Sequence, residues 1–136
     1  MSATKEIVLI TGANKGIGLE TARQLGKKGY KVLLGARDAA LGAKAAESLQ
    51  AAGLDVQAIA IDVVSVSSIA AAAAQVERDF GRLDVLINNA GVLSGDLAKP
   101  AELTGEAARF EFEVNFFGVI NVTHAFIPLL RKAALP

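Results

Sequence analysis

The sequence has no cysteine and only one histidine, His124, among its 136 residues. The lack of cysteine excludes disulfide bonds and thiolate metal sites, and a lone histidine is a poor basis for a metal site, so we predict none. Acidic and basic residues balance to a formal net charge of zero. No basic stretch indicates nucleic-acid binding, so no nucleic-acid partner is expected.

The sequence is also expected to have no apolar stretch that reaches the roughly 18 residues of a membrane span. The N-terminal segment MSATKEIVLITGAN leads from a short apolar run into a glycine turn, not into a small-residue cleavage site, so the run is interpreted as a strand. We therefore expect a cytoplasmic protein with no membrane partner. Hydrophobic residues make up 52% and charged residues 21% of the chain, which favours one folded domain over residues 1–136.

Short apolar segments alternate along the chain with amphipathic ones, which is typical of strands alternating with helices. The expected strands cover residues 6–11, 30–36, 56–61 and 83–87, and the expected helices cover 16–28, 39–52, 66–80 and about 105–130. Predicted N-cap residues are Asp38, Ser65 and Thr104, and predicted stops are Gly29, Gly53 and Gly81. In the last helix, one stripe is expected to hold Phe110, Val114, Phe117 and Asn121. The alternation predicts an α/β fold with a doubly wound parallel sheet in the order 3-2-1-4.

The first predicted strand runs into a glycine-rich turn, TGANKGIG, at residues 11–18. Free backbone N–H groups at the start of the following helix, together with its dipole, favour a phosphate. Gly12, Gly16 and Gly18 are spaced G-x-x-x-G-x-G, which is neither G-x-G-x-x-G nor a P-loop. The motif taken alone therefore fits either a phosphate-binding turn or a plain glycine turn.

A second motif, DVLINNAG at residues 84–91, places Asn88 and Asn89 at the carboxyl end of the fourth predicted strand. Ligands of open α/β sheets lie at the carboxyl ends of the strands. The two asparagines, expected to be buried, need hydrogen-bond partners, which either the neighbouring backbone or a ribose would supply. We expect both kinds of contact.

These motifs, together with Asp62-Val63 and NFFG at residues 115–118, resemble the short-chain dehydrogenase/reductase family over essentially the whole chain, and its carbonyl-reductase branch most. The resemblance implies a Rossmann-type fold, here ending after the fourth strand and the long helix. It also implies an NADP(H)-dependent oxidoreductase that interconverts carbonyls and alcohols, with Asp62 and Val63 beside the adenine. The candidate cofactor-binding residues are Gly12, Asn14, Lys15, Gly16, Ile17, Gly18, Arg37, Asp62, Val63, Asn88, Ala90 and Gly91.

The choice between NADP and NAD depends on the end of the second predicted strand, Ala36-Arg37. NAD sites usually carry an acidic residue there, which binds the ribose 2′-hydroxyl. In this chain Arg37 and Lys15 could instead pair with a 2′-phosphate. The alternatives are a solvated arginine beside Asp38 and an exposed turn lysine. The pattern predicts NADP in preference to NAD.

Catalysis in the resembled family implies a serine, a Tyr-x-x-x-Lys motif and a helix asparagine. Asn115 of NFFG matches the asparagine and is the candidate catalytic residue, although a helix amide bonded to backbone or water is an equally compatible interpretation. The only tyrosine, Tyr30, is followed four residues later by Leu34, and Ser94 comes before the family's serine is due. We therefore expect the cofactor-binding half of a reductase, inactive alone, which would take a small carbonyl substrate only with its other half.

Two alternative functions remain at this point: a non-catalytic NADP-binding module, and a ligand-free structural or interaction remnant. His124 is expected to be exposed or satisfied, not catalytic. The fourth strand would be a bare sheet edge and the last helix would expose apolar residues, so a homo-oligomer formed through them is expected as a partner.

Overall fold

The computed structural model describes residues 4–92 and 100–133, and it contains a parallel sheet of four strands in the order β3-β2-β1-β4. The strands are β1 (Ile7–Ile10), β2 (Lys31–Ala36), β3 (Val56–Ala60) and β4 (Val85–Ile87). The helices are α1 (Gly16–Lys27), α2 (Ala39–Ala51), α3 (Val66–Phe80), η1 (Pro100–Glu102), α4 (Gly105–Phe112), η2 (Glu113–Phe117) and α5 (Gly118–Leu130). The predicted fold class and strand order are confirmed. Ser94 lies outside the described residues.

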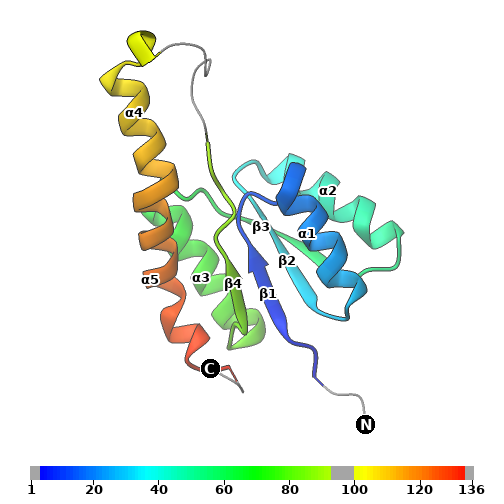
Figure 1. Cartoon of the computed structure of the whole chain (residues 1–136). Coiled ribbons are helices and arrows are strands. Elements are labelled where there is room, and N and C mark those ends of the chain that lie inside the picture. Colours follow the sequence, from blue (N-terminus) through cyan, green and yellow to red (C-terminus); the bar gives the residue numbers. More distant parts are fainter. Residues whose placement is uncertain (1–3, 93–99, 134–136) are drawn as a thin grey trace.

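Helices cover both faces of the sheet, with α1 and α2 on one face and α3 and α5 on the other (Figure 1). Side chains alternate between the faces along each strand, as the strand period of two requires. In β1, Val8 and Ile10 join the cluster under α1 and α2, while Ile7 and Leu9 join the cluster under α3 and α5. Because both faces are covered, the strands consist mainly of apolar residues, as is typical of parallel sheets, and Lys31 and Gln57 are the polar exceptions.

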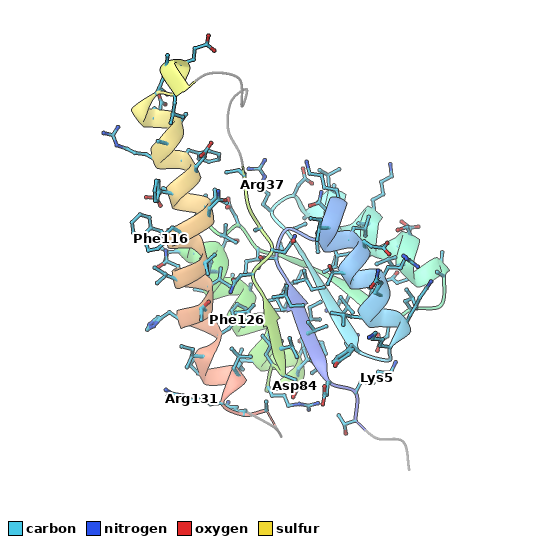
Figure 2. All side chains as sticks on the ribbon, in the orientation of Figure 1. Lys5, Arg37, Asp84, Phe116, Phe126 and Arg131 are labelled. Atoms are coloured by element: carbon cyan, nitrogen blue, oxygen red, sulfur yellow. The ribbon has the colours of Figure 1, made fainter. Side chains whose placement is uncertain are left out.

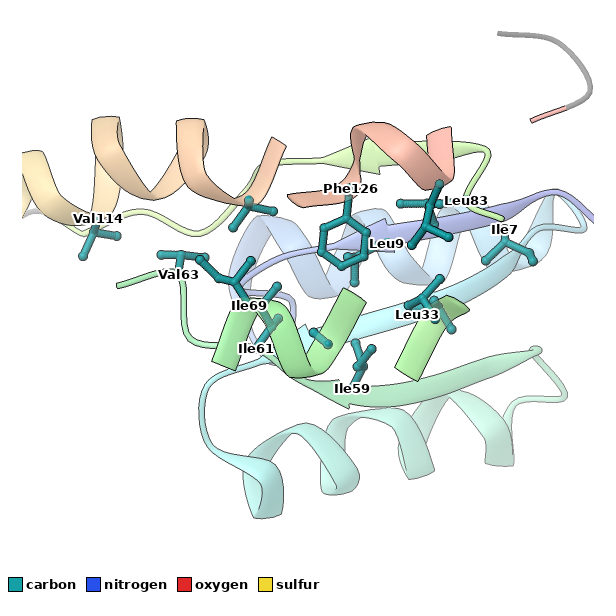
Figure 3. Packing of buried hydrophobic residues seen from close by; sticks show 14 residues of the cluster. Ile7, Leu9, Leu33, Ile59, Ile61, Val63, Ile69, Leu83, Val114 and Phe126 are labelled. Carbon is teal, nitrogen blue, oxygen red and sulfur yellow. The ribbon is translucent and has the colours of Figure 1, made fainter. Parts of the chain in front are cut away.

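The larger of the two clusters has Phe126 of α5 at its centre (Figure 3). The Phe126 side chain is 0% exposed and belongs to the same cluster as Leu9, Leu33 and Ile69. The cluster thus joins α5 to the sheet and to α3.

Three helices begin at the N-cap residues that the sequence predicts. Asp38 Oδ1 accepts hydrogen bonds from Ala40 N at 2.9 Å and Leu41 N at 3.0 Å. Ser65 Oγ accepts from Ser68 N at 3.2 Å, and Thr104 Oγ1 accepts from Ala107 N at 3.1 Å. These side chains satisfy donors that a helix start leaves unpaired.

The stripe predicted for the last helix is wrong in its register after Val114. Val114 is buried, but Phe110, Phe117 and Asn121 are not. The buried stripe instead consists of Val114, Gly118, Val122, Phe126 and Leu129. The cause is η2, a π-helical segment whose wider turn holds an additional residue, so that Gly118 and not Phe117 follows Val114 on the buried face.

The helix Gly105–Leu130, which combines α4, η2 and α5, is long and apolar enough to cross a membrane by length and composition, with a mean hydropathy of 1.3 in its 18-residue window. The expectation that no segment reaches this length is therefore wrong by that criterion. Core helices of folded domains meet the same criterion, and this helix packs its buried stripe against the sheet. The criterion alone does not place the helix in a membrane.

The outward side of this helix exposes the aromatic residues Phe112, Phe116 and Phe117. Figure 2 shows Phe116 directed away from the sheet, whereas Phe126 is directed towards it. Among the described strands, β4 pairs only with β1 and forms one edge of the sheet. The expected exposure is thus present, and self-association through it stays a prediction.

Acid is expected to weaken the fold through Asp55, which lies before β3. Asp55 accepts from Lys31 Nζ at 2.9 Å and from Lys5 Nζ at 3.2 Å, and the hydrogen bond from Lys31 is the main reason that the pKa of Asp55 falls below its usual value. A lowered pKa contributes stability above the unfolded-state value, which is lost as pH falls through the folded-state value. The carboxylate is 36% exposed, so solvent screening limits the pair to about 1 kcal/mol or less.

Urea denaturation of the unaltered chain and of Asp55→Asn should therefore differ at pH 7 and converge as the pH falls below about 4. Asp79→Asn is the control, because within residues 4–92 and 100–133 the Asp79 carboxylate pairs only with its exposed neighbour Arg78. A difference for Asp55→Asn that persists in acid would contradict the assignment.

Candidate functional site

A cavity of about 340 Å³ lies at the carboxyl ends of the strands, where the sequence places both motifs. Every connection that follows a strand contributes to it. The lining residues are Gly12, Asn14, Lys15, Gly16, Ile17, Arg37, Ile61, Asp62, Val63, Val64, Asn89, Ala90, Gly91, Val92, Phe110 and Val114. The structure therefore brings ten of the twelve predicted cofactor-binding residues to one cavity, and the exceptions are Gly18 and Asn88.

The three motif glycines each have a distinct physical role. Gly12 has a φ of +59°, and a Cβ there would lie 2.8 Å from the Ala90 Cα. Gly18 lets α1 approach the turn closely, because a Cβ on it would lie 2.7 Å from the Gly12 carbonyl oxygen. Gly16 has a φ of +60° but nothing within 4 Å of its Cβ position. Gly12 and Gly18 thus fix the shape of the turn, whereas Gly16 faces open space.

The start of α1 differs from the starts of α2, α3 and α4. Its N-cap residue, Lys15, makes no side-chain capping bond, whereas the other three helices each have one. As in α2 and α3, no acidic residue lies in the first turn of α1. The first N–H groups of a helix have no partner inside the helix, and together with the dipole they attract an anion. Because Gly16 and Ile17 border the cavity, the uncapped start of α1 fits a phosphate group.

Asn89 and Thr11 tie the ends of β1 and β4 together. Asn89 Nδ2 donates to the Thr11 carbonyl at 3.1 Å and to the Gly12 carbonyl at 2.9 Å. The buried Thr11 Oγ1 accepts from Asn89 N and Ala90 N, both at 3.0 Å. The bracing role predicted for an asparagine is confirmed for Asn89. The part played by Thr11 was not predicted, although a hydroxyl at the end of an apolar strand, directly before a glycine turn, was its signal.

Asn88 lies apart from this arrangement. It is exposed, contrary to the expectation of burial, and its Nδ2 donates to Thr123 Oγ1 of α5 at 3.1 Å. Successive residues of an extended chain point to opposite sides, so Asn88 and Asn89 cannot both face the turn after β1. Its predicted cofactor contact stays a prediction, and the structure places it outside the cavity lining.

Two cationic side chains, those of Lys15 and Arg37, border the cavity, and both residues are exposed. Neither side chain makes a hydrogen bond or ion pair with the described part of the chain. The Asp38 carboxylate, although adjacent in sequence to Arg37, does not pair with it. It accepts hydrogen bonds from the first N–H groups of α2. Figure 2 shows Arg37 at the opposite end of the sheet from Lys5 and Asp84. The cavity therefore carries two charges that are available to an anionic ligand.

The turn after β3 is held in place by Asp62. Its Oδ1 accepts from Val64 N at 3.1 Å, and its own N–H donates to Ser68 Oγ at 2.9 Å. These bonds fix Asp62 and Val63 at the rim of the cavity.

Asn115 lies in η2, and both ends of its carboxamide bind one residue. Its Oδ1 accepts from Val92 N at 2.8 Å, and its Nδ2 donates to the Val92 carbonyl at 2.7 Å. This pair of bonds fastens the chain after β4 to the long helix, which agrees with the backbone-bonded interpretation. Asn115 is absent from the cavity lining, so its assignment as a catalytic residue stays a prediction. His124 is exposed on α5.

Sequence reasoning missed most of the apolar part of the lining. Ile61, Val64, Val92, Phe110 and Val114 were not predicted as site residues, yet they border the cavity. They come from three separate segments and resemble core residues in the sequence. The only available signal was their position next to predicted motifs.

Comparison with known proteins identifies the family. A model of the short chain dehydrogenase family matches residues 6–134. The chain is 43% identical over 134 residues to short-chain dehydrogenase anuI of Penicillium roqueforti, which covers 97% of this chain and 52% of that protein. It is 35% identical over 133 residues to carbonyl reductase (NADPH) 3 of Homo sapiens, which covers 96% of this chain and 47% of that protein.

A solved structure agrees with these relatives. An actinorhodin polyketide ketoreductase variant with NADPH superposes with a TM-score of 0.83 at 40% identity, over 90% of this chain and 46% of that one. The chain thus spans about half the length of the curated relatives it matches. The resemblance inferred from the motifs is confirmed, and the chain belongs to the short-chain dehydrogenase family.

Proposed function

We propose that this chain is the dinucleotide-binding part of an NADP(H)-dependent oxidoreductase that interconverts carbonyls and alcohols. The observation that carries the proposal is the placement of two cationic side chains, Lys15 and Arg37, on the same cavity as the uncapped start of α1. Neither side chain has a partner among the residues that the structure describes. A 2′-phosphorylated dinucleotide has both a pyrophosphate and a further phosphate. The uncapped start of α1 would take the pyrophosphate, and the two cationic side chains would take the further phosphate.

The residues present fit such a group. The open space at Gly16 and the free N–H groups of α1 would receive the pyrophosphate. The Arg37 guanidinium would bind the 2′-phosphate together with Lys15, through charge-assisted hydrogen bonds. No acidic side chain stands at Ala36 to favour an unphosphorylated ribose.

Asn89 and Asn115 would act on the ligand through the backbone. Asn89 fixes the turn at Gly12, and Asn115 fixes Val92, so both walls of the cavity are rigid before the ligand arrives. Preorganised walls reduce the entropy lost on binding. The bound dinucleotide would supply or accept a hydride. No Tyr-x-x-x-Lys motif occurs in these 136 residues, so reduction of a small carbonyl compound is proposed for the whole enzyme.

Calorimetric titration with NADPH and NADH tests the proposal. The unaltered chain should bind NADPH more tightly, and Arg37→Ala should weaken NADPH binding about tenfold while leaving NADH binding nearly unchanged. A hydrogen bond to a charged group contributes roughly 1.5–3 kcal/mol, which agrees with a loss of this size.

Arg131→Ala is the matched control, because this exposed arginine lies at the far end of the molecule from Arg37 (Figure 2). Equal losses of NADPH and NADH affinity in Arg37→Ala would contradict recognition of the 2′-phosphate. If the unaltered chain binds neither dinucleotide, the ligand-free remnant becomes the better description.

A further inference from the structure

The cavity is lined by two chemically different groups of residues. The polar group contains Lys15 before α1 and Arg37 after β2, together with Asn14, Asp62 and Asn89. The apolar group consists of Ile61, Val63, Val64, Val92, Phe110 and Val114, most of which belong to or pack against the cluster under α3 and α5. A charged phosphate gains nothing from this apolar part, whereas the flat face of a base would be desolvated there.

Among the described residues that line the cavity, Phe110 is the only aromatic one. It lies four residues before Val114, so the two side chains share one side of the helix. Val114 is 6% exposed and belongs to the core cluster, but Phe110 is 42% exposed. Phe110 thus lies on the same side of the helix as Val114, but beyond the core, where its side chain borders the cavity.

The other exposed phenylalanines of this helix behave differently. Phe112 and Phe116 have ring centroids 6.5 Å apart, and Phe116 and Phe117 have centroids 5.2 Å apart. Phe110 makes no such ring contact with the described residues. One face of its ring is therefore available to a ligand in the cavity.

We propose that Phe110 stacks on the purine ring of the dinucleotide and positions its adenosine end. The inference rests on the proposed function and extends it to a residue of α4 that no motif marks. A base stacks on an aromatic side chain through the face of its ring system, which every base has. The interaction should therefore be kept when one aromatic residue replaces another. The cationic lining residues, Lys15 and Arg37, would then select the phosphates, and Phe110 would hold the base.

Calorimetry with adenosine 2′,5′-bisphosphate and with nicotinamide mononucleotide tests the proposal, since only the first carries a purine. Phe110→Ala should weaken binding of the bisphosphate about tenfold, within the range that base stacking gives, and leave the mononucleotide unchanged. Phe110→Tyr should bind the bisphosphate within about twofold of the unaltered chain because it keeps the ring. Phe112→Ala is the control, because Phe112 is exposed on the same helix and does not border the cavity.

Phe110→Leu keeps an apolar side chain and provides a second test if the alanine variant does not fold. It should still lose affinity for the bisphosphate, because it has no ring. If neither variant loses affinity for the bisphosphate, or if the mononucleotide is weakened equally, the proposal is overturned while the proposed function stands. If the unaltered chain binds neither the bisphosphate nor NADPH, the proposed function fails, and this inference fails with it.

Discussion

Replacing Phe126 with alanine is expected to lower the free energy of unfolding by about 3–5 kcal/mol. Phe126 is 0% exposed and lies where α5, α3 and the sheet meet. Its removal loses the transfer free energy of the ring and leaves a cavity that the surrounding strands cannot close. The free energy of unfolding of a whole domain is only about 5–15 kcal/mol, so this single substitution is expected to remove a large part of it.

Urea denaturation followed by far-ultraviolet circular dichroism measures the change. Phe116→Ala is the matched control, because it removes the same ring from the same helix at a position that is 53% exposed. That variant should stay within about 0.5 kcal/mol of the unaltered chain. Similar losses for the two variants would show that the exposed side of the helix is covered in solution, and would support the expected self-association.

The sequence predicted the local elements well because their signals are local. Asp38, Ser65 and Thr104 each stand directly before a helix and each accept the expected backbone hydrogen bonds. The αL glycine Gly81 ends α3 as expected, with a φ of +73°. The strand order followed from the alternation of strands and helices, together with the placement of both motifs at the carboxyl ends of strands.

The register of the last helix could not be predicted in the same way. The residue that follows Val114 on the buried side could be either Phe117 or its neighbour Gly118. Either choice gives a helix face that contains apolar residues. The π-helical turn of η2 is stable because Val114 packs in the core while Asn115 binds the backbone of Val92. These contacts join segments more than twenty residues apart in the sequence, so no local pattern encodes them.

In the candidate site too, the locally encoded part was predictable from the sequence, and the part formed by distant segments was not. Its polar turn, with Lys15 and Gly16, was predicted because one short motif contains it. Its apolar wall was not predicted, because Val64, Val92 and Phe110 come together only when three connections converge. Asn88 was placed in the site by the same motif that correctly marked Asn89, since composition does not reveal which of two adjacent amides faces the turn.

Replacing Gly12 with alanine is expected to destabilise the chain by about 3 kcal/mol, whereas Gly16→Ala should cost only about 1 kcal/mol. Both glycines have nearly the same φ, +59° and +60°, so both variants incur the penalty of roughly 1–2 kcal/mol for an L-residue in that region. Both also gain the same partial offset from a less flexible unfolded chain. The difference between them must come from space alone.

That difference is large because of the Ala90 backbone. A Cβ on Gly12 would lie 2.8 Å from the Ala90 Cα, while a Cβ on Gly16 would have nothing within 4 Å. Relief of the clash would require the turn after β1 and the chain after β4 to separate, and overpacking of this kind costs about 1–3 kcal/mol more. It would also strain the bond from Asn89 Nδ2 to the Gly12 carbonyl.

Gly16→Ala should be the more stable of the two variants, yet it should bind NADPH more weakly than Gly12→Ala does. Gly16→Ala adds a methyl group beside the uncapped start of α1, where the proposed phosphate binds, so it should weaken NADPH binding about tenfold in a chain that remains folded. Thermal unfolding and NADPH calorimetry on both variants measure the two effects separately. Equal stabilities would show that the turn relaxes without cost. Undiminished NADPH binding by Gly16→Ala would place the phosphate elsewhere in the cavity.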